Sequence, residues 1–287
     1  MGTQKSTGRE RLATVRAEQE RAARQRRLLG LVAVLVVLVL VGVLAMWFIS
    51  RDTTDNTAAA DADAVASAQV IDTVTSLPAA TFDAVGRGGA LASPTPLSGS
   101  AALTEDGKPR VLYVGAEFCP FCAMERWSLV AALSRFGTFE GLKGSISSSD
   151  EGELSDIQTL SFLDATYTSA HVALTTYETS DRERAPLQTL SGEDEALFGK
   201  HNPQGGIPWI DWGGDATSGV GFDGRLLVGK SAQAIASALE DPTSEIAQAV
   251  LGSANVETAQ ICALTKGEPA DVCDSPGVKA ASGTFAR

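Results

Sequence analysis

The stretch Glu117-Phe118-Cys119-Pro120-Phe121-Cys122-Ala123 is the most informative part of the sequence. It follows the apolar run 111–114 and precedes a segment with helical spacing, so the expected order is strand, Cys-x-x-Cys and helix. A cysteine at the start of a helix lies beside unpaired backbone N–H groups and the positive end of the helix dipole, which favour a thiolate. Pro120 suits the first turn, because the N–H that proline lacks would have no partner there. The sequence therefore predicts Cys119 as a nucleophile and Cys122, one turn later, as the thiol that resolves a mixed disulfide.

The residues after the motif continue a helical pattern. Apolar side chains recur at helical spacing at four positions: Cys122, Leu129, Leu133 and Phe136. Glu125 and Arg126 are expected to face water. The pattern predicts an exposed Cys119 and a shielded Cys122, and in such motifs the attacking thiol has a lowered pKa.

The cysteine count leaves two other interpretations of this pair open. A Cys-x-x-Cys motif is also half of a zinc site, although such sites usually recruit a second close pair of Cys or His. The remaining cysteines, Cys262 and Cys273, are distant and too widely spaced for a zinc knuckle. The pair would also make an inert disulfide, although so short a loop gains little entropy from closure. Redox activity is the interpretation that the residues favour.

The composition allows one sizeable folded domain with appendages. The chain has 287 residues, of which 44% are apolar, and it carries a net charge of −12. The charge is unevenly divided, because residues 1–27 carry a net +5 and the remainder −17. An acidic body argues against nucleic-acid binding, and solubility is a sufficient explanation for it.

Residues 28–49 form an apolar segment that contains no charged side chain. About 20 apolar residues span a bilayer as a helix, so a transmembrane helix is expected here rather than a shorter, cleaved signal. Arginines precede the segment and aspartates follow it, which places the basic segment 1–27 in the cytoplasm. The expected protein is a single-pass protein of the cell membrane, with residues 50–69 as a flexible tether and residues 70–287 as an extracytoplasmic domain.

This topology changes the meaning of the four cysteines. Outside the cytoplasm disulfides persist, so an external Cys-x-x-Cys indicates the making, breaking or reshuffling of disulfides in exported proteins. Cys262 and Cys273 are expected to form a structural disulfide. A shuttle that passes electrons to Cys119 and Cys122 remains the alternative.

The rest of the chain alternates strand-like and helix-like segments. Strands are expected in apolar, β-branched or aromatic runs at residues 110–115, 141–147, 159–162, 171–177 and 225–228. Helices are expected from the Cys-x-x-Cys motif to about residue 136, and at residues 191–200, 231–239 and 246–262. Pro208 heads a further apolar run and should mark a strand start or edge. The alternation indicates an α/β sheet with a core over residues 110–240 and a helical extension over residues 241–275.

These elements resemble the thioredoxin superfamily. The resemblance rests on the run 116–122 after a strand and on Ile207-Pro208 before a later strand, which is similar to the cis-proline loop of that fold. It implies a thioredoxin-like α/β fold with an insertion around residues 148–190 and the C-terminal extension, preceded by the transmembrane helix. It also implies that Cys119 attacks, that Cys122 resolves, that Pro208 is cis, and that the backbone of Ile207 pairs with a substrate strand.

The wider pattern resembles a membrane-anchored, thioredoxin-like domain-of-unknown-function family of prokaryotes with a Cys-Pro-Phe-Cys motif. That resemblance covers roughly residues 65–278. Strong disulfide donors of this superfamily carry His where this chain has Phe121, so a less oxidising pair is expected. Phe121, together with Phe118 and Trp209, forms either a docking surface for unfolded chains or part of the core.

Two charged residues beside the cysteines are candidate modulators. Glu117 would serve as a proton relay or as a carboxylate without a chemical role. Arg126 would stabilise the thiolate or make an ion pair on the helix surface. The histidines, His171 and His201, lack metal-ligand spacing, and neither a metal nor another cofactor is expected.

The first functional hypothesis is a membrane-anchored, extracytoplasmic thiol–disulfide oxidoreductase that acts on exported proteins through its Cys-Pro-Phe-Cys pair. Its expected partners are exported protein thiols or disulfides, a membrane redox partner that recycles the pair, and the lipid bilayer, without nucleic acid. The alternative is a redox-inert, thioredoxin-like binding module of the cell envelope. Selective alkylation of Cys119 would separate the two.

Overall fold

The computed structural model describes residues 66–91, 93–100 and 102–283. The expected cytoplasmic segment 1–27, the transmembrane helix 28–49 and most of the tether 50–69 lie outside these residues. Within the described residues, no helix combines the length and the apolar character needed to cross a membrane. The first helix of the described residues, α2 (Ala68–Thr75), begins two residues before the domain boundary expected at residue 70, because the Ser67 side chain caps it.

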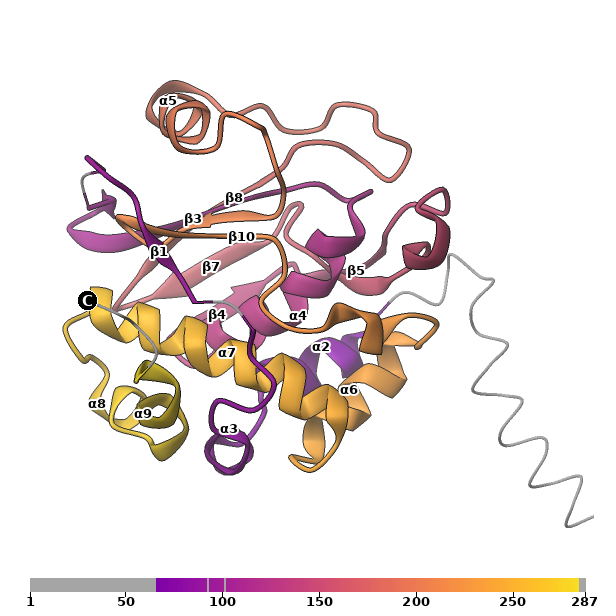
Figure 1. The fold of residues 1–287 in the computed structure, drawn as a ribbon, viewed down its shortest axis with the longest axis vertical. Coiled ribbons are helices and arrows are strands. Elements are labelled where there is room, and N and C mark those ends of the chain that lie inside the picture. Colours follow the sequence, from indigo (N-terminus) through magenta and orange to yellow (C-terminus); the bar gives the residue numbers. More distant parts are fainter. Residues whose placement is uncertain (1–65, 92, 101, 284–287) are drawn as a thin grey trace, which may run out of the picture. The chain divides into compact units, whose positions relative to one another are not determined.

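A mixed sheet lies at the centre of the described domain (Figure 1). Its strands are β1 (Thr95–Pro96), β10 (Asp215–Ser218), β9 (Trp209–Asp211), β3 (Lys108–Gly115) and β2 (Thr104–Glu105), in this order, with β8 (Ala173–Glu178) also paired to β3. Strands β3 and β8 are parallel, whereas the other pairs are antiparallel. The expected α/β class with a sheet at its core is confirmed.

The alternation of side chains along β3 builds the core on both faces of the sheet. Val111 and Tyr113 join the large cluster on one face, while Leu112 and Val114 join a smaller cluster on the other. The smaller cluster lies beneath α5 (Gly192–His201), which Figure 1 shows on the opposite side of the sheet from α4 and α7. Because both faces of the sheet are covered, the sequence of β3 contains the continuous apolar run 111–114 rather than alternating apolar and polar residues.

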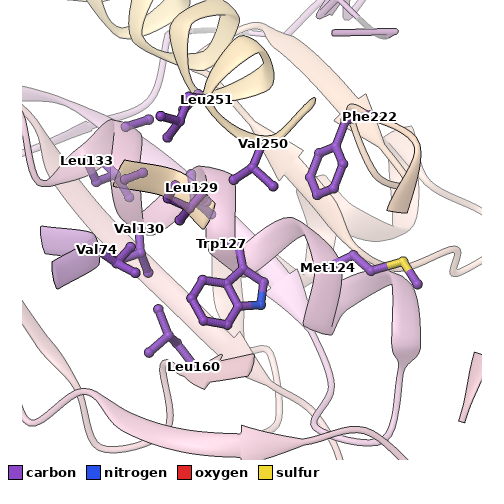
Figure 2. Packing of buried hydrophobic residues seen from close by; sticks show 14 of the residues in the cluster. Val74, Met124, Trp127, Leu129, Val130, Leu133, Leu160, Phe222, Val250 and Leu251 are labelled. Atoms are coloured by element: carbon purple, nitrogen blue, oxygen red, sulfur yellow. The ribbon is translucent and has the colours of Figure 1, made fainter. Parts of the chain in front are cut away.

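Helix α4 (Pro120–Leu133) is buried on nearly all sides, and only Phe121 of its residues is exposed. It lies between the sheet and the long helix α7 (Glu245–Leu264), and α2 packs against it as well. Figure 2 shows Trp127 of α4 within this packing, together with side chains from β6, α2 and α7: Leu160, Val74, Val250 and Leu251. The expectation that Glu125 and Arg126 face water is therefore wrong, because other segments cover both side chains: Glu178 of β8 binds Arg126, and the Gly221 N–H bonds to Glu125.

Residues 137–169 form two small antiparallel pairs beside the main sheet. Strand β4 (Gly137–Glu140) pairs with β7 (Thr166–Ser169), and β5 (Lys143–Ile146) pairs with β6 (Gln158–Ser161). A short 3-10 helix, η1 (Gly152–Leu154), lies in the connection between β5 and β6. The strands expected at residues 141–147 and 159–162 correspond to β5 and β6.

The prediction of a strand at residues 225–228 is wrong. Residues 225–228 do not form a strand, because Gly224–Leu227 is the 3-10 helix η2, which the Asp223 side chain caps through the Arg225 N–H. The partner of β9 is instead β10, which lies closer in sequence. The remaining helices are α3 (Ala79–Val85), α6 (Ala232–Glu240), α8 (Ala270–Cys273) and α9 (Pro276–Ser282), so the helical extension continues beyond residue 275.

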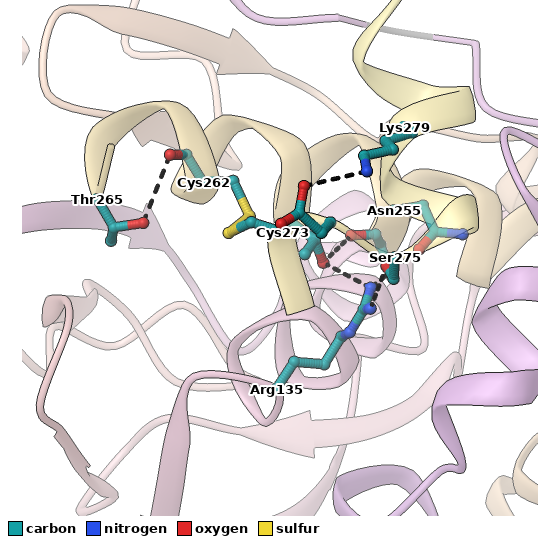
Figure 3. The surroundings of a disulfide bond; sticks show 10 residues. Arg135, Asn255, Cys262, Thr265, Cys273, Ser275 and Lys279 are labelled. Carbon is teal, nitrogen blue, oxygen red and sulfur yellow. Dashed lines mark hydrogen bonds and ion pairs between the residues drawn. A yellow bond between two sulfur atoms is a disulfide. The ribbon is translucent and has the colours of Figure 1, made fainter. Parts of the chain in front are cut away.

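The structure contains the expected disulfide between Cys262 of α7 and Cys273 of α8 (Figure 3). Arg135 lies close by and donates hydrogen bonds to Asn255 Oδ1 at 3.0 Å and to Ser275 Oγ at 3.1 Å. The disulfide and these bonds hold the end of α7 and the turn before α9 against the C-terminal end of α4.

Replacing Cys262 and Cys273 together by alanine should lower the free energy of unfolding by up to about 3 kcal/mol, because the 11-residue separation closes a short loop. Urea unfolding of the full-length protein measures the change. Alkylation of Cys119 should be unaffected. An unchanged urea midpoint would show that this disulfide contributes no stability.

Candidate dithiol site

Two parallel strands end side by side at the candidate site. Strands β3 and β8 run in register, with Gly115 opposite Glu178, so both chains leave the sheet at the same edge. The backbone N–H of Glu117 donates to Ser180 O at 2.9 Å, and Thr179 N donates to Gly115 O at 2.8 Å. These bonds hold the segment before Cys119 close to the end of β8.

Cys119 is the N-cap residue of α4, as the sequence predicts. Its backbone is extended (φ −75°, ψ 120°), and its Sγ accepts a hydrogen bond from the Cys122 N–H at 3.3 Å. Pro120 occupies the first turn. The sulfur therefore takes the place that a serine or aspartate oxygen fills at other helix starts, where an anion is favoured.

Both thiols are free, but neither is openly exposed. Cys122 is fully buried, and only 4% of the Cys119 surface is accessible. The expected exposed position of Cys119 is therefore not found, because Phe118 and Ile207 pack around the two sulfurs. A substrate sulfur would reach Cys119 only if one of these side chains moved.

The surroundings separate the pKa values of the two thiols. A hydrogen bond from the Cys122 thiol lowers the pKa of Cys119 against the opposing effect of burial, and the Cys122 N–H and the charge of Arg126 lower it further. Burial raises the pKa of Cys122 well above its ordinary value, and its bond to Cys119 adds to this. Cys119 is thus the thiol that ionises first.

The loop before β9 meets Cys119 directly. The Ile207-Pro208 peptide bond is cis, as the resemblance implied, and the Cys119 thiol lies 3.6 Å from Ile207 O in hydrogen-bonding geometry. Trp209 follows at the start of β9, opposite Val114 of β3. The pairing of β9 with β3 thus brings the loop to the cysteines.

A buried charge cluster lies beside the cysteines. Arg126 is fully buried and donates to both carboxylate oxygens of Glu178, at 3.0 and 2.6 Å, and to Ala116 O at 3.0 Å. Glu117 Oε1 lies 3.7 Å from the same Arg126 nitrogen, Nη2, that contacts Glu178. The two candidate modulators, Glu117 and Arg126, are therefore brought together, although Arg126 makes a buried ion pair rather than a surface one.

Glu117 is anchored by two serines. Its Oε1 accepts from Ser161 Oγ at 2.6 Å, and its Oε2 accepts from Ser145 Oγ. Glu117 is 7% exposed and borders a groove of about 470 Å³, whose walls include Arg182 and Leu187. Water in this groove can therefore come close to a charged group two residues before Cys119.

Sequence reasoning missed Glu178, which completes the cluster. Burial raises its pKa to about 7 despite the nearby Arg126. Burial lowers the pKa of Arg126, but Glu178 and other neighbours more than offset this effect, and Arg126 stays protonated. One signal in the sequence could have identified Glu178: it is a lone acid directly after the strand expected at residues 171–177. If that strand runs parallel to the strand before Cys119, their carboxyl ends meet at the same edge of the sheet.

The aromatic side chains around the motif differ in exposure. Phe121 is 44% exposed, whereas Trp209 is buried against Phe198 of α5. The Arg184 guanidinium covers the Phe118 ring at 4.1 Å and also pairs with Glu151. Of the expected aromatic surface, only Phe121 is therefore openly exposed, while Trp209 belongs to the core.

No group of three or more metal-ligating side chains occurs among residues 66–91, 93–100 and 102–283. His201 is the last residue of α5, and His171 lies between β7 and β8. The reactive groups assembled at this site are thus two thiols and a buried Arg–Glu cluster.

A family model described as "Domain of unknown function (DUF929)" matches residues 98–205. The matched region contains β3, the Cys-Pro-Phe-Cys turn, α4 and Glu178, and it ends just before Ile207-Pro208. The chain is therefore similar to a domain-of-unknown-function family, over a narrower range than the resemblance described above. Comparisons with curated proteins and with solved structures find no match to this chain.

Proposed function

We propose that this chain is a thioredoxin-like thiol–disulfide oxidoreductase. The observation that carries the proposal is the position of Cys119: its sulfur caps α4, accepts from Cys122 N–H and lies against Ile207 O. A free, low-pKa cysteine beside a shielded second thiol is the arrangement that disulfide exchange uses.

In the proposed reaction, the Cys119 thiolate attacks one sulfur of a substrate disulfide. A bond forms between Cys119 and that sulfur, and the other substrate sulfur leaves as a thiolate. Cys122 then loses its proton and attacks Cys119, which releases the second substrate thiolate and leaves a Cys119–Cys122 disulfide. The substrate is reduced by two electrons and the pair is oxidised; the reverse sequence forms a disulfide in the substrate.

The buried charge cluster supports the same proposal. Cys122 has a raised pKa, so its attack requires a nearby group that accepts a proton. Glu178, with a pKa of about 7, is suited to take up and release a proton near neutral pH. Arg126 lowers the pKa of both thiols and so favours their thiolate forms.

The apolar segment 28–49 and the charges that flank it support a location on the outer side of the cell membrane. Exported proteins are then the proposed substrates, and a membrane redox partner would restore the pair after each turnover. The disulfide between Cys262 and Cys273 is consistent with an oxidising compartment.

The test is alkylation of the reduced full-length protein over a range of pH, with mass spectrometry to locate the label. Cys119 should be labelled first, at a pH below the ordinary range of a thiol, and Cys122 only at much higher pH or after unfolding. Equilibration with glutathione buffers then gives the reduction potential: about −120 mV indicates a disulfide donor and about −270 mV a reductant.

A redox-inert binding module of the cell envelope is the second candidate, and the exposure of Phe121 favours it. An aromatic side chain that is 44% exposed can dock a partner without any thiol chemistry. If Cys119 neither alkylates selectively nor exchanges with glutathione, the enzymatic proposal fails and the binding module takes its place.

A further inference from the structure

Helix α4 carries one acid, Glu125, which is buried and contacts the segment around Gly221 rather than the Arg126 cluster. Glu125 is only 2% exposed, and its Oε2 accepts a hydrogen bond from the Gly221 N–H at 3.0 Å. Glu257 of α7 is 4% exposed; its Oε1 accepts from Ser253 Oγ at 3.1 Å, and its Oε2 has no hydrogen-bond partner in the described part of the chain. The two carboxyl groups influence each other electrostatically.

No cation of the described residues forms an ion pair with these two acids. The charged side chains on the segments packed near the pair include Arg87, Asp223 and Arg225, while Arg126 is bound to Glu178 and Arg135 to Asn255, Thr258 and Ser275. Two buried carboxylates without a counter-ion cannot both ionise at low cost, so the pair retains protons.

The pair is connected to the loop beside Cys119. Gly219 N donates to Pro208 O at 2.9 Å, and two residues later Gly221 N donates to Glu125. The backbone at Gly221 is tightly enclosed, because a Cβ there would lie 2.2 Å from Ser253 Oγ. The segment 219–221 thus joins Pro208 to α4 on one side and to α7 on the other.

We propose that Glu125 is a positioning residue: paired with Glu257, it holds the segment after Pro208 against the cysteine-bearing helix while the pair keeps a proton. When both groups ionise, the repulsion between the two buried charges outweighs the stronger bond from the Gly221 N–H to the Glu125 carboxylate, and the segment loosens. This inference rests on the proposed function, since it concerns the placement of Ile207 and Pro208 beside Cys119. It gives that site a dependence on external pH.

The direction of the pH effect follows from the two acids. Burial raises the pKa of Glu125 from 4.5 to about 7, and burial and Glu125 raise the pKa of Glu257 well above its ordinary value. The folded protein therefore binds more protons than the unfolded chain above pH 4.5. The contribution of the pair to stability is largest below that pH and is lost as pH rises through 7, with Glu257 extending the loss to higher pH.

The experiment compares the full-length protein with Glu257→Gln, Glu257→Ala and, as a control at an exposed acid, Glu240→Gln. Urea midpoints followed by tryptophan fluorescence at pH 5, 6.5 and 8 should fall with pH in the unaltered protein and in the control. Between pH 5 and pH 8, the folded-to-unfolded ratio of Glu257→Gln should fall by a factor about ten times smaller than that of the unaltered protein. The reason is that glutamine keeps the shape of glutamate but does not ionise. Glu257→Ala should be less stable than Glu257→Gln at every pH.

A second measurement links the pair to the thiol. The rate of Cys119 alkylation should show an inflection near pH 7 in the unaltered protein that Glu257→Gln reduces. A urea profile of Glu257→Gln parallel to that of the unaltered protein would overturn the titrating pair. A flattened urea profile with an unchanged alkylation profile would overturn the positioning role alone. If Cys119 in the unaltered protein is inert at every pH, the proposed function itself is lost, whatever the urea profiles show.

Discussion

Cys122→Ser should trap the protein in mixed disulfides with its substrates. Serine fits the buried position of Cys122 but cannot attack the bond that Cys119 forms, so the intermediate is not resolved. The amount of covalent complex at Cys119 should rise by about tenfold or more over the unaltered protein. Non-reducing electrophoresis of membranes from cells that make the full-length variant, followed by mass spectrometry of the released partners, measures it and identifies the substrates.

Two matched variants give this experiment its controls. Cys119→Ser should form no complex, because Cys122 is fully buried and its pKa is raised. The double variant Cys119→Ser with Cys122→Ser should also form none. Complexes of equal amount in Cys119→Ser and Cys122→Ser would contradict the assignment of Cys119 as the attacking thiol.

Arg126→Met should destabilise the protein by about 3–5 kcal/mol, because it leaves Glu178 buried without its ion-pair partner. The same change removes the bond to Ala116 O, next to the start of the cysteine motif. The loss should be greater at pH 8 than at pH 5, because without Arg126 the pKa of Glu178 rises further and the protonated acid is tolerated at low pH. Urea unfolding at the two pH values measures both effects.

The control for this prediction is the double variant Arg126→Met with Glu178→Met. Removing both charges should recover much of the stability, since apolar side chains of similar size can replace a buried pair. The stability of Arg126→Lys should lie between those of Arg126→Met and the unaltered protein, because lysine keeps the charge but cannot repeat the bidentate contact with Glu178. If Arg126→Met is as stable as the unaltered protein, or if the double variant is no better than the single one, the buried pair does not have the energetic role assigned to it.

The parts of the site that sequence reasoning found are those with local signals. A strand, a Cys-x-x-Cys and a helical pattern are contiguous, so the capping position of Cys119 follows from a few neighbouring residues. The strand start at Pro208 was predicted from a proline at the head of an apolar run, whereas the cis bond and the place of Ile207-Pro208 beside the cysteines came from the resemblance to the thioredoxin superfamily. The strands at residues 110–115 and 171–177 were also found, because β3 and β8 are rich in apolar, β-branched and aromatic residues.

The parts of the site that were missed depend on tertiary contacts between segments that are distant in the sequence. The sequence of α4 shows Glu125 and Arg126 as ordinary polar positions, and only distant segments bury them: Arg126 lies against Glu178, and Glu125 against Gly221. Glu178 belongs to the site because it binds Arg126, which lies 52 residues earlier in the chain. The exposure of Cys119 was overestimated for the same reason, since Phe118 and Ile207 cover it only in the folded chain.

The distance in sequence between Cys119 and its surroundings has a consequence for how the protein is made. The carbonyl that contacts Cys119 belongs to a residue 88 positions later, and Glu178 also follows the cysteines. During synthesis from the N-terminus, both thiols emerge before the strands that shield them exist, while Cys262 and Cys273 emerge last. The nascent chain thus passes through a period with an unprotected dithiol, in which pairing with other emerging cysteines competes with the slow closure of long-range strand contacts.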